Sequence, residues 1–270
     1  MTRGLEGSSG VIHPDGRSLR FLVVDDDPLN RNMMELMLAP HGYELEFATD
    51  GSEALEAIKS RPFDLVFMDL ILPDMNGRDV ARQVREFEAG KQHLPIVAVT
   101  AFDMPGQPLE LVKAGMDDYI FKPYDFRGLS RIIQLYAVDQ GQGPGNPVEP
   151  SARVLGPDAP VLDTAGTLQD FSDDVDGYKE LLRDFLASLP VRFGKMEQAY
   201  TAGDYESLSR ECHTLKGVSA GLGAMRLSRL ATQLGRSCAD GHRHSAESLL
   251  RELDEALAQV RAEAATFLER

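Results

Sequence analysis

The sequence is poor in cysteine and has no long hydrophobic run. Its 270 residues include two cysteines, Cys212 and Cys238, which is too few for a disulfide framework. The low count suits a protein of the reducing cytoplasm. Both cysteines lie in segments with an amphipathic helical pattern, so we expect them to be small buried hydrophobic residues. No stretch approaches the roughly 20 apolar residues that span a bilayer. Residues 1–20 also lack the apolar segment of a secretory signal, and we expect no membrane insertion.

Basic residues are outnumbered throughout the chain. The sequence has 28 lysines and arginines against 43 acidic residues, a net charge of −15. Residues 19–137 have a net charge of −8 and residues 163–270 a net charge of −5. Neither half has the clustered basic surface that neutralises nucleic-acid phosphates. We therefore expect no nucleic-acid partner.

A change in composition divides the chain into two domains. Residues 138–162 contain five prolines and four glycines and show no apolar period, which predicts an interdomain linker. Residues 1–18 are predicted to be a flexible N-terminal segment. The remaining parts, residues 19–137 and 163–270, are each long enough to form a domain with its own core.

Short apolar runs alternate with helical patterns in residues 19–137. The runs predict strands at 19–24, 43–48, 63–70, 94–100 and 118–121, with 43–48 patterned like an edge strand. Helical patterns lie at 51–60, 76–89, 105–115 and about 125–138, and Pro28 suits the first turn of another helix. Five β/α units of this kind predict an α/β domain with a parallel sheet covered on both faces. Its functional site is expected beyond the C-terminal ends of the strands.

Residues 163–270 lack strand signals and are predicted to be all-α. The predicted helices span 164–170, 175–188, 190–202, 204–221, 223–240 and 243–267. A four-helix bundle with a helical N-terminal lead is the packing that this pattern favours.

Polar residues stand at the ends of the predicted strands. Asp25 and Asp26 end the first strand and Asp69 the third, so three carboxylates are expected in one cleft. Because like charges repel, they require a divalent cation or raised pKa values, and Mg²⁺ suits such oxygen ligands. Thr100 and Lys122, at the ends of the fourth and fifth strands, would complete a cradle for a phosphoryl group.

Each of these residues also has a purely structural interpretation. An aspartate after a strand is often a helix N-cap, the role expected for Asp27 before Pro28. A threonine in a strand is commonly structural, and the Lys-Pro pair at 122–123 is compatible with a simple turn. The joint spacing of the set favours the functional interpretation.

Four segments, "FLVVDDDPLNR", "DLVFMDLILPDMNG", "VAVTA" and "DDYIFKP", resemble the motifs of response-regulator receiver domains. The resemblance implies a doubly wound, flavodoxin-like sheet of order 2-1-3-4-5 and identifies Asp69 as the phosphoacceptor. It also implies that Asp26, with Asp25 assisting, and the backbone carbonyl of Ile71 hold Mg²⁺ beside Asp69.

The same resemblance assigns roles near the phosphoryl group. Lys122 would neutralise that group, and Thr100 would bond one of its oxygens. Tyr119 resembles the aromatic residue that turns inward when the domain is phosphorylated. The bond before Pro123 is cis in the family.

A second unusual pattern surrounds His213. The predicted helix places one apolar stripe inward, made of Leu208, Cys212, Leu215, Ser219 and Leu222. His213, Lys216, Gly217 and Ala220 lie on the neighbouring stripe. A glycine inside a helix costs about 1 kcal/mol relative to alanine, so Gly217 requires a reason.

The pattern suits an imidazole that must meet a bulky partner. Lys216 can pair with a phosphoryl group on His213, and Gly217 leaves clearance for docking. Gln233, on the next predicted helix, is a further candidate to reach that group.

A lone histidine is usually an ordinary surface residue, which is our interpretation of His41, His93, His242 and His244. "HTLKGVSAGLGA", however, resembles the signature of histidine-containing phosphotransfer (HPt) domains, which implies that His213 is phosphorylated.

A receiver followed by an HPt domain predicts a two-component phosphorelay protein that passes a phosphoryl group between Asp69 and His213, in cis or through partners. The expected partners are an upstream sensor histidine kinase and a downstream response-regulator receiver. We expect no kinase catalytic domain within this sequence. Two alternatives remain open: a regulatory module in which receiver phosphorylation gates access to His213, and the C-terminal portion of a hybrid histidine kinase. A Mg²⁺-dependent phosphohydrolase would leave His213 unexplained.

Overall fold

The computed structural model describes residues 16–88, 92–100, 107–138, 160–239 and 243–270. The chain divides into two compact units between Pro150 and Ser151, within the predicted linker. Most of the predicted N-terminal segment and linker lies outside the described residues. The predicted limits of the two domains therefore stay predictions.

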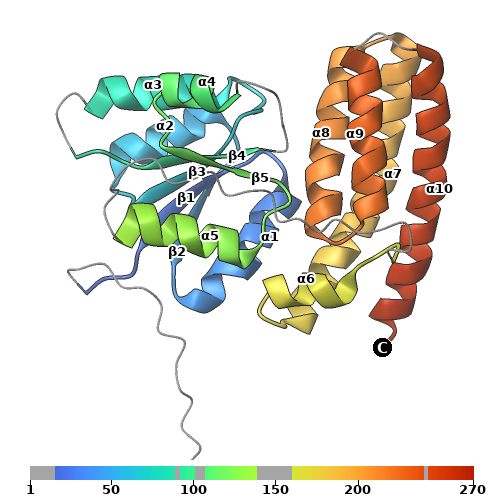
Figure 1. Cartoon of the computed structure of the whole chain (residues 1–270), viewed down its shortest axis with the longest axis horizontal. Helices are drawn as coiled ribbons and strands as arrows, with labels where there is room; N and C mark the ends of the chain where they lie inside the picture. Colours follow the sequence, from blue (N-terminus) through green and yellow to red (C-terminus); the bar gives the residue numbers. More distant parts are fainter. Residues whose placement is uncertain (1–15, 89–91, 101–106, 139–159, 240–242) are drawn as a thin grey trace, which may run out of the picture. The chain divides into compact units, whose positions relative to one another are not determined.

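The first unit alternates strands and helices along the chain (Figure 1). Its strands are β1 (Arg20–Val24), β2 (Glu44–Ala48), β3 (Leu65–Asp69), β4 (Ile96–Thr100) and β5 (Asp118–Phe121). Its α-helices are α1 (Pro28–Leu38), α2 (Gly51–Ser60), α3 (Gly77–Glu88), α4 (Gln107–Lys113) and α5 (Phe126–Ile133). A 3-10 turn, η1 (Ala39–His41), follows α1, and a π-helical segment, η2 (Gln134–Val138), ends α5. The final helix predicted at 125–138 thus changes its winding over its last five residues.

The five strands form one parallel sheet of order β2-β1-β3-β4-β5. This order confirms the predicted doubly wound topology and places β2 at an edge. Leu22, Val66 and Ile96 lie side by side on neighbouring strands and belong to the core shared with α2, α3 and α4. The residues that follow them in each strand alternate to the other face and are also buried: Val23, Phe67 and Val97. Burial of both faces explains why these strands are continuous apolar runs.

Aspartates cap helices in both units. The side chain of Asp27 accepts the Leu29 amide at 2.9 Å just before Pro28, which confirms the predicted N-cap of α1. Other aspartates do the same for α2 and α5, namely Asp50 and Asp125. In the second unit Asp163, Asp174 and Asp204 cap the helices α6 (Thr164–Asp170), α7 (Val175–Ala202) and α8 (Tyr205–Gly221). Each cap pairs a backbone N–H that the helix itself cannot satisfy.

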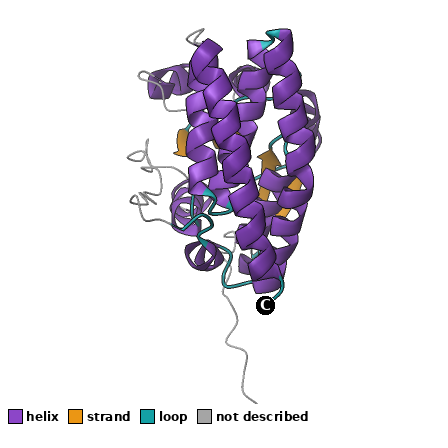
Figure 2. Ribbon diagram, turned by 90° about the vertical axis from the view of Figure 1, so that its right-hand side faces the viewer, coloured by secondary structure: helices purple, strands orange, loops and turns teal. Residues whose placement is uncertain are grey.

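The second unit contains helices and no strand among its described residues. Its helices are α6 (Thr164–Asp170), α7 (Val175–Ala202), α8 (Tyr205–Gly221), α9 (Met225–Ala239) and α10 (Arg243–Leu268). The four long helices lie side by side as a bundle, with α6 as the lead (Figures 1 and 2). This arrangement confirms the predicted helical bundle.

The predicted break at residue 189 is wrong, because α7 runs continuously through Pro190. Proline lacks the N–H of a helical hydrogen bond, which led us to divide the helix there. In the structure Pro190 lies on the exposed side of α7, while Phe185, Leu189 and Met196 are buried on its inner side. Packing of this apolar side holds the helix together across the missing bond.

An aromatic cluster closes one end of the bundle. Tyr178 of α7 is fully buried, with its ring against Phe171 and Phe267 at centroid distances of 5.9 and 5.5 Å. Its hydroxyl donates to the Leu222 carbonyl at 3.0 Å, in the turn between α8 and α9. We call Phe171, Tyr178 and Phe267 the basal cluster. It joins the residue after α6 to α7, to α10 and to the end of α8, which carries His213 and is called the histidine helix below.

The lead segment before α6 is bonded to the same end of the bundle. The Asp163 amide donates to the Gly223 carbonyl at 3.1 Å, and the Leu162 amide donates to Glu263 at 2.9 Å. Gly223 has φ +85°, and a Cβ there would lie 2.5 Å from the Thr167 hydroxyl. Glycine is therefore required at this contact by both its backbone conformation and the available space.

Candidate functional site

The strand ends of the first unit bring together a buried lysine and two carboxylates. Lys122, just after β5, places its Nζ 2.6 Å from Oδ2 of Asp25 and 2.6 Å from Oδ2 of Asp69. All three side chains are at least nine-tenths buried. The structure thus brings Asp25, Asp69 and Lys122 together at this edge of the sheet, as the sequence predicted.

The remaining carboxylate oxygens are held by α1 and by the loop after β3. Asp25 Oδ1 accepts from the Asp27 amide at 2.9 Å and from Asn30 Nδ2 at 3.0 Å. Asp69 Oδ1 accepts from the Ile71 amide at 3.1 Å. Sequence reasoning missed Asn30; its position in the first turn of the helix after "DDDP" was the available signal. These bonds fix the orientation of both carboxylates.

Burial and neighbouring charges both shift pKa values in the site. Burial alone would lower the pKa of Lys122, but the charges of Asp25 and Asp69 outweigh burial and raise that pKa above its ordinary value. Asp26 lies at the surface, yet partial desolvation, followed by the charges of Asp25 and Asp69, raises the pKa of its carboxyl to about 6. The site therefore contains more negative charge than its lysine neutralises, which favours an added cation.

Thr100 and Tyr119 lie on the neighbouring strands. Thr100 is fully buried at the end of β4, and its carbonyl accepts the Lys122 amide at 2.8 Å. Tyr119 is half-buried in β5, and its ring contacts that of Phe121 at 5.1 Å. The Lys122–Pro123 bond is cis, as the resemblance implied. The switch roles of Thr100 and Tyr119 stay predictions.

The predicted Mg²⁺ ligands include a backbone group. Among the described residues, no three side chains of the types that bind metals are grouped closely enough to form a site on their own. The predicted set combines the carboxylates of Asp25, Asp26 and Asp69 with the Ile71 carbonyl, and all of these are oxygen donors. Hard oxygen ligands with excess negative charge fit Mg²⁺, which keeps several of its waters.

Two glycines allow close packing at the first residues of α2 and α3. A Cβ at Gly77, the first residue of α3, would lie 2.2 Å from the Asp69 carbonyl oxygen. A Cβ at Gly51, the first residue of α2, would lie 2.5 Å from the Met75 side chain. Neither contact was predicted, because both join segments that are separated in the sequence.

The histidine helix has the predicted inward stripe. Leu208, Cys212, Leu215, Ser219 and Leu222 are all buried, and both cysteines are free thiols in the interior, as expected. His213 and Lys216 are half-buried on α8, Gly217 and Ala220 are buried, and Gln233 is exposed on α9. The phosphoryl-contacting roles of Lys216 and Gln233 and the docking role of Gly217 stay predictions.

Gly235 is a residue that the sequence analysis missed. A Cβ at this position of α9 would lie 3.4 Å from the Cβ of Cys212 on α8. This is an ordinary van der Waals distance, so α9 passes near α8 here without glycine being required. Gly235 is half-buried, and no local pattern in the sequence distinguishes it.

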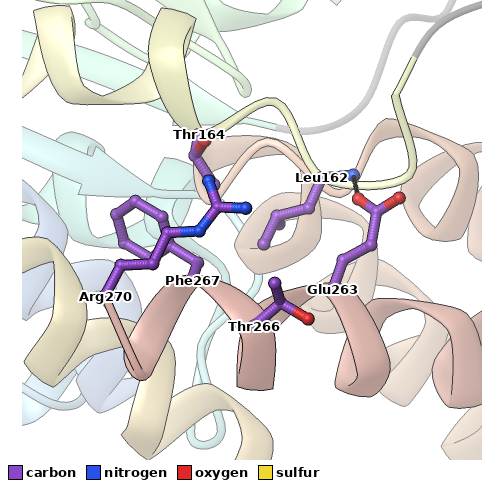
Figure 3. A pocket seen from close by; sticks show the side chains of 6 residues that line it. All are labelled: Leu162, Thr164, Glu263, Thr266, Phe267 and Arg270. Carbon is purple, nitrogen blue, oxygen red and sulfur yellow. Dashed lines mark hydrogen bonds between the residues drawn. The ribbon is translucent and has the colours of Figure 1, made fainter.

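A pocket of about 220 Å³ lies at the C-terminal end of α10 (Figure 3). It is lined by Leu162, Thr164, Glu263, Thr266, Phe267 and Arg270. Glu263 in its wall accepts the Leu162 amide, so the pocket borders the lead segment. None of the predicted site residues lines it.

Family models match both units. Residues 21–134 match the response regulator receiver domain, and residues 180–263 match the Hpt domain. No helix within the described residues has the length and apolar character needed to cross a membrane.

The chain is also similar to curated sensor kinases. It is 33% identical over 254 residues to the sensor histidine kinase GacS of Pseudomonas protegens, covering 93% of this chain and 27% of that protein. It is 29% identical over 254 residues to the signal transduction histidine-protein kinase BarA of Escherichia coli K12, with the same coverage. The chain thus spans about a quarter of the length of these relatives.

Among solved structures, a similar one is the receiver domain of the sensor histidine kinase PA1611 of Pseudomonas aeruginosa. It is 33% identical with a TM-score of 0.41, and the match covers 44% of this chain and 98% of that one. That structure is described with a magnesium ion coordinated in its active-site cleft.

Proposed function

The chain joins a response regulator receiver domain to an Hpt domain, and from this premise we propose that it relays a phosphoryl group between Asp69 and His213. The observation that supports this proposal most directly is the buried arrangement of Asp25, Asp69 and Lys122. It provides a carboxylate nucleophile with a fixed cation beside it. The half-buried His213 on α8 is the corresponding nucleophile of the second unit.

Transfer to Asp69 replaces a P–N bond by a P–O bond. A carboxylate oxygen of Asp69 attacks the phosphorus of a phosphohistidine, and the imidazole nitrogen leaves with the electron pair of the P–N bond. Lys122, which is held between the carboxylates, stabilises negative charge on the phosphoryl oxygens. In the reverse step the imidazole of His213 attacks phospho-Asp69, and the carboxylate leaves. Positioning and charge provide most of the catalysis in such transfers.

Mg²⁺ would be held by Asp25, Asp26, Asp69 and the Ile71 carbonyl, where it supplies positive charge for the phosphoryl oxygens. Without it, desolvation by burial, followed by the charges of the neighbouring carboxylates, raises the pKa of Asp26 to about 6. The same three aspartates that repel one another are the ligands of choice for a divalent cation. This charge balance supports the proposed cofactor.

We further propose two kinds of partner. A sensor histidine kinase would deliver the phosphoryl group to the receiver, and another response-regulator receiver would accept it from His213. Similarity over most of this chain to part of the sensor kinases GacS and BarA supports a place within such a relay. Thr100, Tyr119, Lys216, Gly217 and Gln233 keep the roles given in the sequence analysis as part of this proposal.

Labelling of the purified chain tests the relay. The full chain is incubated with Mg²⁺ and a radiolabelled acyl phosphate, and acid-stable and base-stable label are followed in wild type, Asp69→Ala and His213→Gln. We expect base-stable label on His213 that disappears in Asp69→Ala, and a dilution series separates transfer in cis from transfer in trans. Label that stays on Asp69 and never reaches His213 contradicts transfer within this chain and favours the gating alternative.

A further inference from the structure

The loop between β3 and α3 is bonded to the start of α2 by one side chain, Asp74. Its Oδ1 accepts the Gly51 amide at 2.8 Å and the Met75 amide at 2.8 Å. Its Oδ2 accepts the Ser52 amide at 3.0 Å and the Ser52 hydroxyl at 2.8 Å. This surface carboxylate thus accepts four hydrogen bonds. Three of them join the loop to Gly51 and Ser52, which precede Asp74 by 23 and 22 residues in the sequence.

Capping of α2 does not by itself account for Asp74. Asp50 already caps this helix from within its own segment, since its Oδ1 accepts the Glu53 amide at 2.8 Å. Asp74 binds the two amides before that, and it does so from a different loop. Its distinctive effect is therefore to fix the loop rather than to start the helix.

The other end of the same loop is fixed against the phosphoacceptor. The Gly77 amide donates to the Leu70 carbonyl at 3.1 Å, and a Cβ at Gly77 would collide with the Asp69 carbonyl oxygen. Ile71 pairs with Asn76 across the loop in an isolated bridge. The backbone between Asp69 and Gly77 is therefore a closed loop with a fixed base, and Asp74 fixes its far side.

The position of Ile71 depends on this loop. Its amide donates to Asp69 Oδ1, so its backbone orients the phosphoacceptor carboxylate directly. Its carbonyl is a proposed Mg²⁺ ligand. We propose that Asp74 is a positioning residue that holds the β3–α3 loop on α2 and so fixes both backbone groups of Ile71 for metal binding at Asp69. This inference rests on the proposed function.

The test compares Asp74→Ala with Asp50→Ala in the full chain. Each variant removes one carboxylate and one cap from the start of α2, so they share the change in charge and in helix stability. Mg²⁺ affinity is measured by titration calorimetry. We expect a loss of about tenfold in Asp74→Ala, as is typical of residues that orient metal ligands, and less than twofold in Asp50→Ala. Asp74→Asn, which keeps one acceptor oxygen, should fall between wild type and Asp74→Ala.

Amide hydrogen exchange of residues 70–76 provides a readout that needs no metal. We expect faster exchange in Asp74→Ala but not in Asp50→Ala. Labelling of Asp69 by an acyl phosphate should need more Mg²⁺ in Asp74→Ala yet reach the wild-type rate at saturation. If Asp74→Ala folds poorly, Ser52→Ala removes a single bond of the four and should shift the same quantities less.

The outcomes separate this inference from the function on which it rests. Equal Mg²⁺ affinity and equal loop exchange in Asp74→Ala and Asp50→Ala would overturn the role of Asp74. A wild-type chain that neither binds Mg²⁺ nor labels on Asp69 would instead overturn the proposed function. In that case the exchange comparison still decides whether Asp74 fixes the loop.

Discussion

Lys122 is enclosed by two carboxylates in an interior where charges are poorly solvated. Its Nζ lies 2.6 Å from both Asp25 and Asp69, and its side chain is 3% exposed. Removal of one member of such a group leaves buried charge uncompensated, which costs far more than the loss of a surface ion pair. The lysine therefore stabilises the metal-free domain in addition to its proposed role in phosphoryl transfer.

We expect Lys122→Met to lower the free energy of unfolding by about 3–5 kcal/mol at pH 7.5. Urea denaturation without metal measures the loss. Lys113→Met is the matched control, because Lys113 makes an exposed ion pair with Glu110, and we expect no measurable change in stability there. A loss in Lys122→Met no larger than in the control would contradict a stabilising role of Lys122.

Asp26 gives the metal-free protein a specific pH dependence. Its pKa is raised to about 6, so the folded state binds this proton more tightly than the unfolded chain does. Ionisation of Asp26 therefore destabilises the fold progressively as the pH rises from about 4 to about 6, and the penalty stays constant above that range. It vanishes well below the ordinary pKa of 3.8, where both states are protonated. We expect Asp26→Asn to raise Tm at pH 7.5 and to have little effect at about pH 3. Thermal unfolding without metal checks this, and a pH-independent difference would rule out the explanation.

Helices and strands were predictable where their pattern is local. The buried strands β3 and β4, the cap of Asp27 and the inward stripe of α8 follow from short runs of sequence. The continuity of α7 through Pro190 was not predictable, because it depends on packing against the rest of the bundle. The contacts of Asp74 and Gly77 were missed for a related reason: they join the site to segments that no local pattern connects.

Two glycines of the helical unit should respond oppositely to alanine. A Cβ at Gly194, within α7, would meet no atom within 4 Å, whereas one at Gly223 would meet Thr167 and the Asp163 backbone at positive φ. We expect Gly194→Ala to stabilise the protein by about 0.5–1 kcal/mol. Gly223→Ala should destabilise it by about 1–3 kcal/mol. Chemical denaturation of both variants measures the effects, and a destabilising Gly194→Ala would reveal a contact that the structure does not contain.

The second unit extends beyond the residues that match the Hpt family. The match covers 180–263, whereas the basal cluster includes Phe171, Tyr178 and Phe267, which all lie outside it. The bond from Asp163 to Gly223 adds a further contact from the lead segment to the turn that follows the histidine helix. The bundle is thus closed at this end by residues that flank the family match.

We expect a fragment of residues 160–270 to unfold cooperatively and a fragment of residues 180–263 to be much less stable, because the latter exposes the buried surface around Leu222. Thermal unfolding followed by circular dichroism compares the two fragments. Tyr178→Phe in the longer fragment is an intermediate case, since it leaves the Leu222 carbonyl without this hydrogen bond at a cost of about 1–3 kcal/mol. Equal melting temperatures for the two fragments would show that the basal cluster adds nothing.

The basal cluster also bears on how this domain can be transplanted. A protein engineer who grafts the phosphotransfer helix into another signalling protein, and cuts at the limits of the family match, would discard all three rings of the basal cluster. The portable module is longer than the recognisable one. Any fusion should be joined upstream of Leu162, so that the basal cluster stays complete. The hydrogen bond from the Leu162 amide to Glu263 is then kept, and the preceding peptide enters the bundle as it does here.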